Sequence, residues 1–437
     1  MAKLNTKVPQ IHTHEGAVAS HINAEQQLRR SVMSCLLWES EFYEDGQSIA
    51  GRIQNTIPLV KPEIVAQIAK DARGPMKLRH VPLLIARTMA ALPKHKALVA
   101  NVLADIIQRP DELAEFLAIY WKEKKAPLSA QVKKGLARSF QKFDAYALSK
   151  WNKDGAIKLR DVLFLCHAKP KDEAQAALWK QLVDGTLPIP DTWEVALSAG
   201  NDKKTTWERL LSENKLGALA LLRNLRNMQD VGVDREIIKT GLEQMKVDRV
   251  LPFRFIAAAK YAPNLEPFIE PAMLKCASSL EKIRGNTALL VDHSGSMRAP
   301  ISQRSEITRF DAAGALGIIL REICIDDFRL FTFSDNCVEV APRRGFAMID
   351  AVKYIINPQW TLLGKAVDFV YSKFPECERL IVITDEQSAD KPRDPQGRGY
   401  IINVASAQNG IGYGAWNHID GFSEAVLDYI RVFESTE

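Results

Sequence analysis

The sequence has no long apolar run and no paired cysteines. No stretch of eighteen apolar residues occurs in the 437 residues, and residues 1–10 lack the basic and then apolar layout of a signal peptide. The six cysteines are scattered singly, with neither a Cys-x-x-Cys pair nor a Cys/His cluster at zinc spacing. We therefore expect a cytoplasmic protein that does not enter the membrane, with mostly buried, reduced cysteines and neither disulfides nor zinc.

Three sequence patterns of common catalytic sites are also missing. The chain contains no Gly-x-x-x-x-Gly-Lys phosphate loop, no Gly-x-Ser-x-Gly elbow and no His-Glu-x-x-His zinc helix. Residues 410–414 are rich in glycine, but their spacing does not fit a dinucleotide fingerprint, and a turn explains them better. We expect a protein that is not an enzyme.

Positive charge is concentrated in one part of the chain. The overall composition, with 46% apolar and 25% charged residues, is typical of globular proteins, and the length predicts two or more domains. Residues 121–171 hold 13 lysines and arginines against 4 acidic residues, whereas residues 285–437 carry a net negative charge. A basic surface is therefore expected in the first part of the chain.

Residues 1–284 show a helical pattern almost throughout. Apolar residues recur at helical spacing in residues 99–106 and again in residues 113–120, and prolines punctuate the helices every ten to twenty residues. Stacked helix pairs of the HEAT or armadillo kind fit this pattern, because each pair buries its apolar face against its neighbours. No clean sequence period is visible, so an irregular helical bundle stays open as the alternative.

Residues 285–437 alternate between short apolar strands and helices. The expected strands are residues 286–291, 328–333, 337–340, 379–384 and 400–404, and the expected helices are residues 307–325, 345–356, 363–373 and 422–433. This alternation predicts a doubly wound α/β domain with a mostly parallel sheet, in which 328–333 and 337–340 form a hairpin. Ligands of such sheets bind beyond the carboxyl ends of the strands, where Asp292 and Asp385 fall.

An Asp-x-Ser-x-Ser loop follows the first of these strands. Its residues Asp292, Ser294 and Ser296 offer hard oxygen ligands of the kind that Mg²⁺ favours, although a strand-to-helix turn with a capping serine would look the same. With Thr361 and Asp385, the loop resembles the metal-ion-dependent adhesion site of von Willebrand factor A domains over residues 285–437. The resemblance implies Mg²⁺, or another divalent cation, held by these five residues with one position left for a partner's carboxylate or phosphate. His293 is expected to point away from the ion.

The basic stretch has the composition of a polyanion-binding surface. Its cations can displace phosphate counterions, and Phe140, Phe143, Tyr146 and Trp151 could supply rings on which bases stack, although charge runs are often just solvated helix surface. The candidate RNA-binding residues are Lys133, Lys134, Arg138, Lys142, Lys150, Lys153, Lys158, Arg160, His167 and Lys169.

Four segments, residues 158–170, 191–194, 206–210 and 218–228, resemble the TROVE module of the Ro 60-kDa autoantigen family, and the chain length suits a bacterial or phage member. The resemblance implies a HEAT-like helical repeat ring, residues 1–284, followed by the von Willebrand A domain. It also implies binding of small non-coding Y RNA on the basic outer surface and of single-stranded ends of misfolded RNA in the hole. Lys150 and His167 match family residues that touch Y RNA, whereas Asp154 stands where the family has an arginine.

The leading hypothesis is a non-catalytic RNA-binding protein in RNA quality control or small-RNA metabolism, expected to be a monomer. A nuclease or another protein is the candidate partner at the metal site. The alternative is an adaptor that grips an acidic peptide through Mg²⁺, with the helical half as scaffold. Chelation by EDTA would abolish partner binding in the second case and leave RNA binding intact in the first.

Overall fold

A computed structural model describes residues 10–33, 45–198, 200–247, 250, 253–278, 280–301, 306–352, 360–405, 407–421, 429–430 and 433–434. The chain forms two compact units, one from Met1–Ile49 with Leu242–Glu437 and one from Ala50–Gly241. The expected domain boundary at Gly285 lies inside the first unit, and it stays a prediction. No helix in the described part of the chain is both long and apolar enough to span a membrane.

The unit Ala50–Gly241 is helical, as the apolar spacing predicted. Its helices in chain order are α2 (Gly46–Thr56, which begins in the other unit), α3 (Pro62–Arg73), α4 (His80–Ala91), α5 (Val99–Ile106), α6 (Asp111–Tyr120), α7 (Ala130–Phe140), α8 (Ala145–Trp151), α9 (Leu159–Cys166), α10 (Glu173–Asp184), α11 (Trp193–Ser198), α12 (Lys203–Ser212) and α13 (Ala218–Asp230). Several begin at side-chain caps, because Ser129, Asp144, Asp172 and Asp202 each accept a hydrogen bond from a backbone N–H three residues later.

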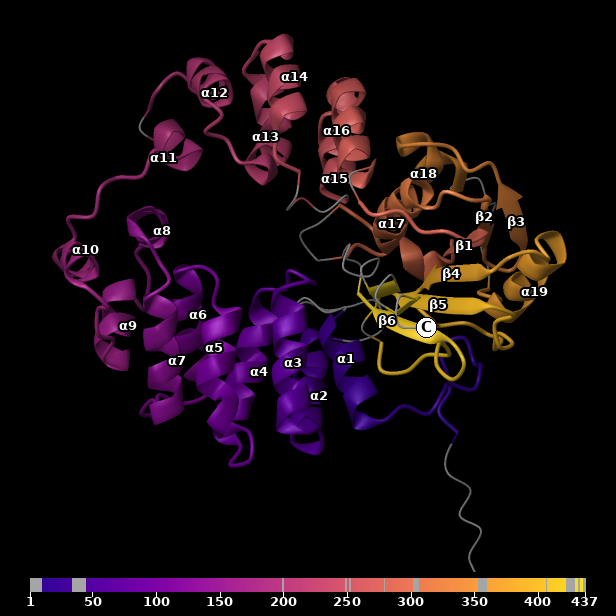
Figure 1. The fold of residues 1–437 in the computed structure, drawn as a ribbon, viewed down its shortest axis with the longest axis horizontal. Helices are drawn as coiled ribbons and strands as arrows, with labels where there is room; N and C mark the ends of the chain where they lie inside the picture. The colour runs from indigo at the N-terminus through magenta and orange to yellow at the C-terminus, as the bar shows by residue number, and fades with distance from the viewer. Residues whose placement is uncertain are drawn as a thin grey trace, which may run out of the picture. The chain divides into compact units, whose positions relative to one another are not determined.

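Helices α3 to α7 lie side by side, as Figure 1 shows. Helices α5 and α7 approach each other closely at Gly135, because a Cβ added there would lie 2.8 Å from the Leu103 Cβ and 3.1 Å from the Ala100 Cα. A buried ion pair of 2.6 Å between Arg73 and Glu112 links α3 to α6. This part of the chain therefore has the repeated helical packing that the sequence predicted.

The other unit combines helices with a six-stranded sheet. Its elements are α1 (Ala24–Met33), α14 (Arg235–Gln244, which begins in the helical unit), α15 (Phe253–Tyr261), α16 (Glu266–Ser278), β1 (Thr287–Asp292), α17 (Arg309–Ile323), β2 (Phe328–Phe333), β3 (Cys337–Val340), α18 (Phe346–Val352), α19 (Leu363–Lys373), β4 (Arg379–Thr384), β5 (Arg398–Asn403) and β6 (Asn417–Asp420). The strand order is β3-β2-β1-β4-β5-β6, and every neighbouring pair is parallel except β2 with β3. The predicted α/β fold and the predicted hairpin are confirmed.

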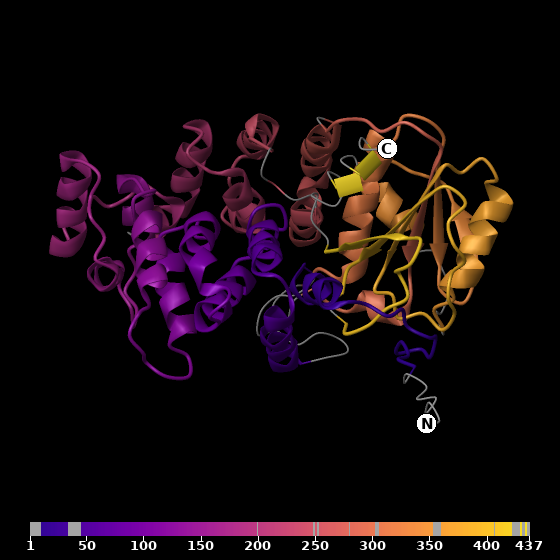
Figure 2. The ribbon, with the colours of Figure 1, turned by 60° about the horizontal axis from the view of Figure 1, so that its bottom comes forward.

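Helices cover both faces of the sheet, with α17 on one side and α19 on the other (Figure 2). Ala288 and Leu290 of β1 join the apolar cluster that contains α19, whereas Leu289 between them lies next to Gly317 of α17. All residues of β1 and β4 are buried as a result. This double cover explains why both strands read as continuous apolar runs in the sequence.

Some expected elements differ from the structure or lie outside it. The helix expected at 345–356 corresponds to α18, which is described as Phe346–Val352, and residues 353–359 are outside the described part. Most of the helix expected at 422–433 is outside it too. Strand β6 was not predicted, because only one of its four residues, Ile419, is apolar. Cys166, Cys276, Cys324, Cys337 and Cys377 are free thiols, and all except the partly exposed Cys337 are buried; Cys35 lies outside the description.

Candidate cation site and basic helical surface

Two buried carboxylates lie at the carboxyl edge of the sheet. Asp292 ends β1 and Asp385 follows β4, and the two strands pair in parallel, so both side chains are brought to the same edge. One oxygen of Asp292 accepts a hydrogen bond from the Thr384 hydroxyl (2.6 Å) and the other from the Ser294 N–H (2.8 Å). Both aspartates are 0% exposed, so each carboxylate is held in a defined position away from bulk water.

Hydroxyl groups complete this edge. The Oγ atoms of Ser294 and Ser296 lie 3.1 Å apart at a 3₁₀ turn (Gly295–Arg298), and both side chains are buried. Thr361 is buried just before α19, and its carbonyl accepts hydrogen bonds of 2.8 Å from the Ser388 hydroxyl and the Ala389 N–H. The loop that follows Asp385 is therefore tied to Thr361.

The electrostatics of this edge favour a cation. Burial, with the charge of Asp385 as the second cause, raises the pKa of Asp292 well above its usual range. The buried Arg309 guanidinium lies 3.8 Å from Asp385. Within the described residues, no three His, Cys, Asp or Glu side chains gather into a metal-binding group. The available donors are thus two carboxylates and three hydroxyls, a set of oxygens that suits Mg²⁺ better than zinc or copper.

A glutamate from the beginning of the chain also reaches this edge. The Glu15 carboxylate accepts hydrogen bonds from the Thr361 N–H (2.6 Å) and from the Thr361 hydroxyl (2.9 Å). Burial raises the pKa of Glu15, the bonds from Thr361 oppose this shift, and the charge of Asp385 adds to it. The sequence analysis missed Glu15 because it precedes Thr361 by 346 residues, and it missed Arg309 because nothing in its spacing links it to Asp385.

His293 does not join the donors. Its ring packs edge to face on Phe310, with centroids 5.0 Å apart, and burial lowers its pKa. This position fits the expectation that an imidazole in the loop would not be a ligand.

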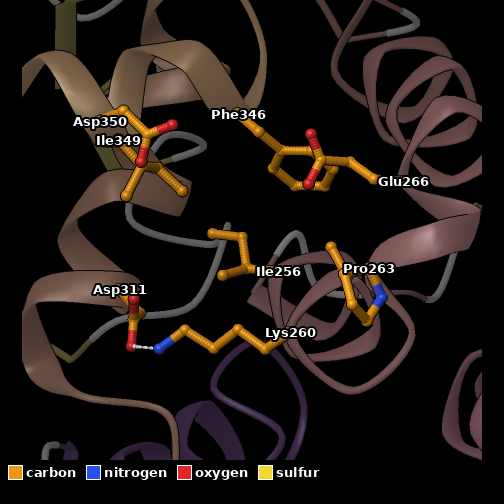
Figure 3. A pocket seen from close by; sticks show the side chains of 9 residues that line it. Ile256, Lys260, Pro263, Glu266, Asp311, Phe346, Ile349 and Asp350 are labelled. Carbon is orange, nitrogen blue, oxygen red and sulfur yellow. Dashed lines mark hydrogen bonds and ion pairs between the residues drawn. The ribbon is translucent and has the colours of Figure 1, made fainter.

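A separate cavity of about 250 Å³ lies between α15, α17 and α18 (Figure 3). Lys260 on its wall pairs with Asp311, which also accepts hydrogen bonds of 2.8 Å from the N–H and the hydroxyl of Thr308 at the start of α17. Phe346 and Ile349 supply apolar walls. The charged pair therefore supports helix packing, and the carboxyl edge of the sheet stays the better candidate for a binding site.

The predicted RNA-binding residues all lie on or beside α7, α8 and α9 of the helical unit. The side chains of Lys134, Arg138, Lys142, Lys153, Arg160, His167 and Lys169 are exposed, and those of Lys133, Lys150 and Lys158 are partly exposed. His167 ends α9 in the left-handed conformation (φ 53°) with its ring at the surface. Its position excludes the core role that a lone histidine often has.

An aromatic cluster lies within this surface. The Arg109 guanidinium covers the Trp151 ring at 3.6 Å, and the ammonium groups of Lys153 and Lys150 lie 5.4 and 5.8 Å from the centre of the same ring. Tyr146 is 55% exposed beside Lys150. Sequence reasoning missed Arg109 because it lies on the loop before α6, outside the basic stretch.

Three expectations for this surface need correction. Phe140 and Phe143 cannot stack on bases, because their side chains are 0% and 7% exposed in the helical core. The Lys142 ammonium donates to the carbonyls of Ala104 and Ile107 at the end of α5, and its desolvation there lowers the pKa of this lysine. Lys142 therefore caps a helix, although its side chain is partly accessible.

Asp154, which stands where the Ro family has an arginine, forms an ion pair with a neighbouring lysine. Its carboxylate lies 2.8 Å from the Lys158 ammonium, which lowers the pKa of Asp154, and its side chain is 95% exposed. Asp154 thus neutralises one candidate cation as well as adding a negative charge where phosphate is expected. Lys153 next to it stays exposed.

Comparison with known proteins connects both parts to characterised sequences and folds. The family model of the TROVE domain matches residues 179–300. Telomerase protein component 1 of Mus musculus is 28% identical over 210 residues, which cover 44% of this chain and 8% of that protein. The protein of the same name from Rattus norvegicus is 35% identical over 86 residues, which cover 18% of this chain and 3% of that protein. The chain thus spans only a small part of these relatives.

The fold comparison covers nearly the whole chain. The crystal structure of the Deinococcus radiodurans Ro (RSR) protein matches 94% of this chain and 99% of that chain, with a TM-score of 0.59 and 17% sequence identity. The likeness therefore extends over the helical part and the α/β part. Residues 179–300 are thus similar to the TROVE domain, and the chain has the fold of the Deinococcus radiodurans Ro protein.

Proposed function

We propose that this protein binds RNA through the basic surface of α7, α8 and α9, and that its role is binding and not catalysis. The observation that carries the proposal is the exposed group of cations around Tyr146 and Trp151. Such a surface attracts phosphates through counterion release and offers a ring for base stacking. The TROVE match and the Ro fold support the same conclusion.

The proposal extends to the class of RNA. We take small structured non-coding RNA of the Y type, and the single-stranded ends of misfolded RNA, as the expected ligands. Lys150 and His167 lie at either side of the segment that would carry the structured RNA. Because Asp154 places a carboxylate between them, the preferred RNA should avoid a phosphate at that point.

The test is the salt dependence of RNA affinity in the full chain. Each phosphate contact contributes about 0.7 to the slope of log affinity against log salt for single strands and about 0.9 for duplexes. A labelled 20-nucleotide single strand and a labelled hairpin serve as probes. The test variant carries Lys150→Gln, Lys153→Gln and Arg160→Gln together, and we expect its slope to fall by about 2.

A matched control removes three cations elsewhere in the same unit. Lys180, Lys204 and Lys239 each pair with an acidic residue three or four positions away, so Lys→Gln at these sites leaves the basic surface intact. We expect this control to keep the wild-type slope. Equal affinity of the test variant, the control and the wild type would refute the proposed surface. A preference for one probe identifies the RNA class.

We also propose that Asp292, Ser294, Ser296, Thr361 and Asp385 hold Mg²⁺ or a similar divalent cation. The buried carboxylate pair at the carboxyl edge of the sheet, with three hydroxyls beside it, is the support for this proposal. The cation would supply a docking point for a carboxylate of a protein partner such as a nuclease. Since two-metal nucleases need clustered carboxylates, the hydroxyl-rich donor set fits docking better than hydrolysis. RNA binding that persists in EDTA would separate the two surfaces.

A further inference from the structure

The start of the chain forms a small turn that carries Glu15 at its tip, here called the Glu15 turn (residues 12–18). His12 and Val18 pair as an antiparallel bridge, and the Thr13 N–H donates to the Ala17 carbonyl (2.9 Å). The Thr13 hydroxyl accepts hydrogen bonds from the N–H groups of Gly16 and Ala17 (3.1 and 3.0 Å). Gly16 has a φ of 101°, which a residue with a Cβ rarely adopts. The turn is thus a specific structure that projects one carboxylate.

The Glu15 turn is fastened to the loops that border the candidate cation site. The Thr13 hydroxyl donates to the Ser388 carbonyl (2.6 Å), and the His14 N–H donates to the side-chain oxygen of Gln387 (2.9 Å). Both partners belong to the loop that begins with Asp385. On the other side, the Asn409 amide donates to the His12 carbonyl (2.9 Å).

An apolar contact and a backbone–backbone hydrogen bond strengthen this attachment. Ala17 is buried in the same cluster as Leu363 of α19 and Ile411. The Ser20 N–H donates to the Gly410 carbonyl (2.9 Å). Hydrogen bonds from residues before and after Glu15 therefore hold its side chain against Thr361. A surface side chain that approached Thr361 by chance would not be anchored in this way.

We propose that Glu15 is the acidic partner of this cation site, supplied by the chain itself. A site built from two aspartates and three hydroxyls leaves coordination positions open, and a carboxylate is the group expected there. Glu15 already contacts Thr361, one of the five candidate donors, through both its N–H and its hydroxyl. The Glu15 turn therefore closes the site, and an external acidic partner has to displace it.

This inference rests on the proposed cation site and goes beyond it. A purely structural role for Glu15 would be to hold Thr361 in place, which a neutral side chain of the same shape could also do. Ligation of a cation requires the negative charge. Glu15→Gln and Glu15→Ala therefore separate the two roles.

The experiment measures Mn²⁺ binding and the water-proton relaxivity of the bound ion in the full-length protein. We expect Glu15→Ala and Glu15→Gln to bind Mn²⁺ about tenfold more weakly, the size usual when a supporting group at a metal site is lost. The relaxivity of the bound ion should rise in both variants, because water takes the vacated position. Added acetate should lower the relaxivity again in Glu15→Ala and leave the wild type unchanged.

Glu25→Gln serves as the control, since Glu25 is a surface glutamate of α1 that pairs with Arg29. Its Mn²⁺ affinity and relaxivity should equal those of the wild type. Wild-type affinity and relaxivity in Glu15→Gln would overturn the role of Glu15 while leaving the cation site standing. Absence of Mn²⁺ binding in the wild type would overturn the cation site and this inference together. Circular dichroism of each variant confirms that the fold is retained.

Discussion

Removing the side chain of Arg30 should strongly destabilise the α/β unit. Arg30 lies on α1, and both it and Glu386, with which it forms an ion pair, have side chains that are 0% exposed. It also donates to the carbonyls of Ala407 and Asn409, the latter at 2.6 Å. Arg30→Ala would leave a buried carboxylate and two carbonyls without this donor, a change that costs about 3–5 kcal/mol.

Urea unfolding of the full-length protein, followed by circular dichroism, measures this cost. With a urea dependence of about 3 kcal/mol per molar, the midpoint should fall by about 1–1.7 M. Arg29→Ala is the matched control on the same helix, because Arg29 pairs with Glu25 at the surface and such pairs contribute about 0.5 kcal/mol or less.

A second variant distinguishes two causes of the lost stability, namely the unpaired charge of Glu386 and the lost packing of the Arg30 side chain. Arg30→Met with Glu386→Gln removes both charges, so it should recover a large part of the lost stability. Since Glu386 directly follows Asp385, Arg30→Ala should also weaken Mn²⁺ binding. Equal midpoints for Arg30→Ala and Arg29→Ala would refute this account of the buried pair.

Three further predictions follow from other parts of the structure. Lys134→Met should lower the salt slope of RNA binding by about 0.7, whereas Lys142→Met should leave the slope unchanged and destabilise the helical unit by about 1 kcal/mol, as titration and urea unfolding will show. Gly135→Ala should cost about 1–3 kcal/mol in the same unfolding assay, because the new methyl group would overlap α5. Burial raises the pKa of Glu386, but the positive charges of His418 and Arg30 lower it more and hold it at about 2. Burial lowers the pKa of His418, but the negative charges of Asp420 and Glu386 raise it more, so the net shift is upward. The Glu386 contribution is therefore present above its ordinary pKa and lost as the pH falls toward 2, and that of His418 is lost as the pH rises through its raised pKa. The joint contribution of Glu386 and His418 should thus be largest at about pH 4.5–6.5, and the difference in unfolding free energy between the wild type and His418→Gln should shrink as the pH rises above about 6.5.

The elements that the sequence predicted well are those whose burial leaves a local pattern. Strands β1 and β4 read as apolar runs because helices cover both faces, and their terminal carboxylates follow directly from those runs. Strand β6 has no such run, since its first two residues are only partly buried. Its place at the sheet is decided by pairing with β5, which a local pattern does not show.

For the candidate binding sites, too, the sequence predicted what depends on local composition and missed what depends on tertiary contacts. Composition located the basic stretch, but it could not separate Tyr146 at the surface from Phe140 in the core, because that depends on packing against other helices. Lys142 and Lys153 cannot be told apart in the sequence. Only the structure shows that the Lys142 ammonium donates to carbonyls at the end of α5. Glu15 gave no signal at all, since its partner Thr361 is reached only through the tertiary fold.

The discontinuous α/β unit has a consequence for how the chain is made. The Arg30–Glu386 pair joins residues 356 positions apart, so α1 leaves the ribosome long before its binding site exists. At a synthesis rate of about 5–20 residues per second, this helix waits roughly 20–70 seconds. During that interval its arginine and apolar side chains stay uncovered, which makes the nascent chain a natural client for a chaperone.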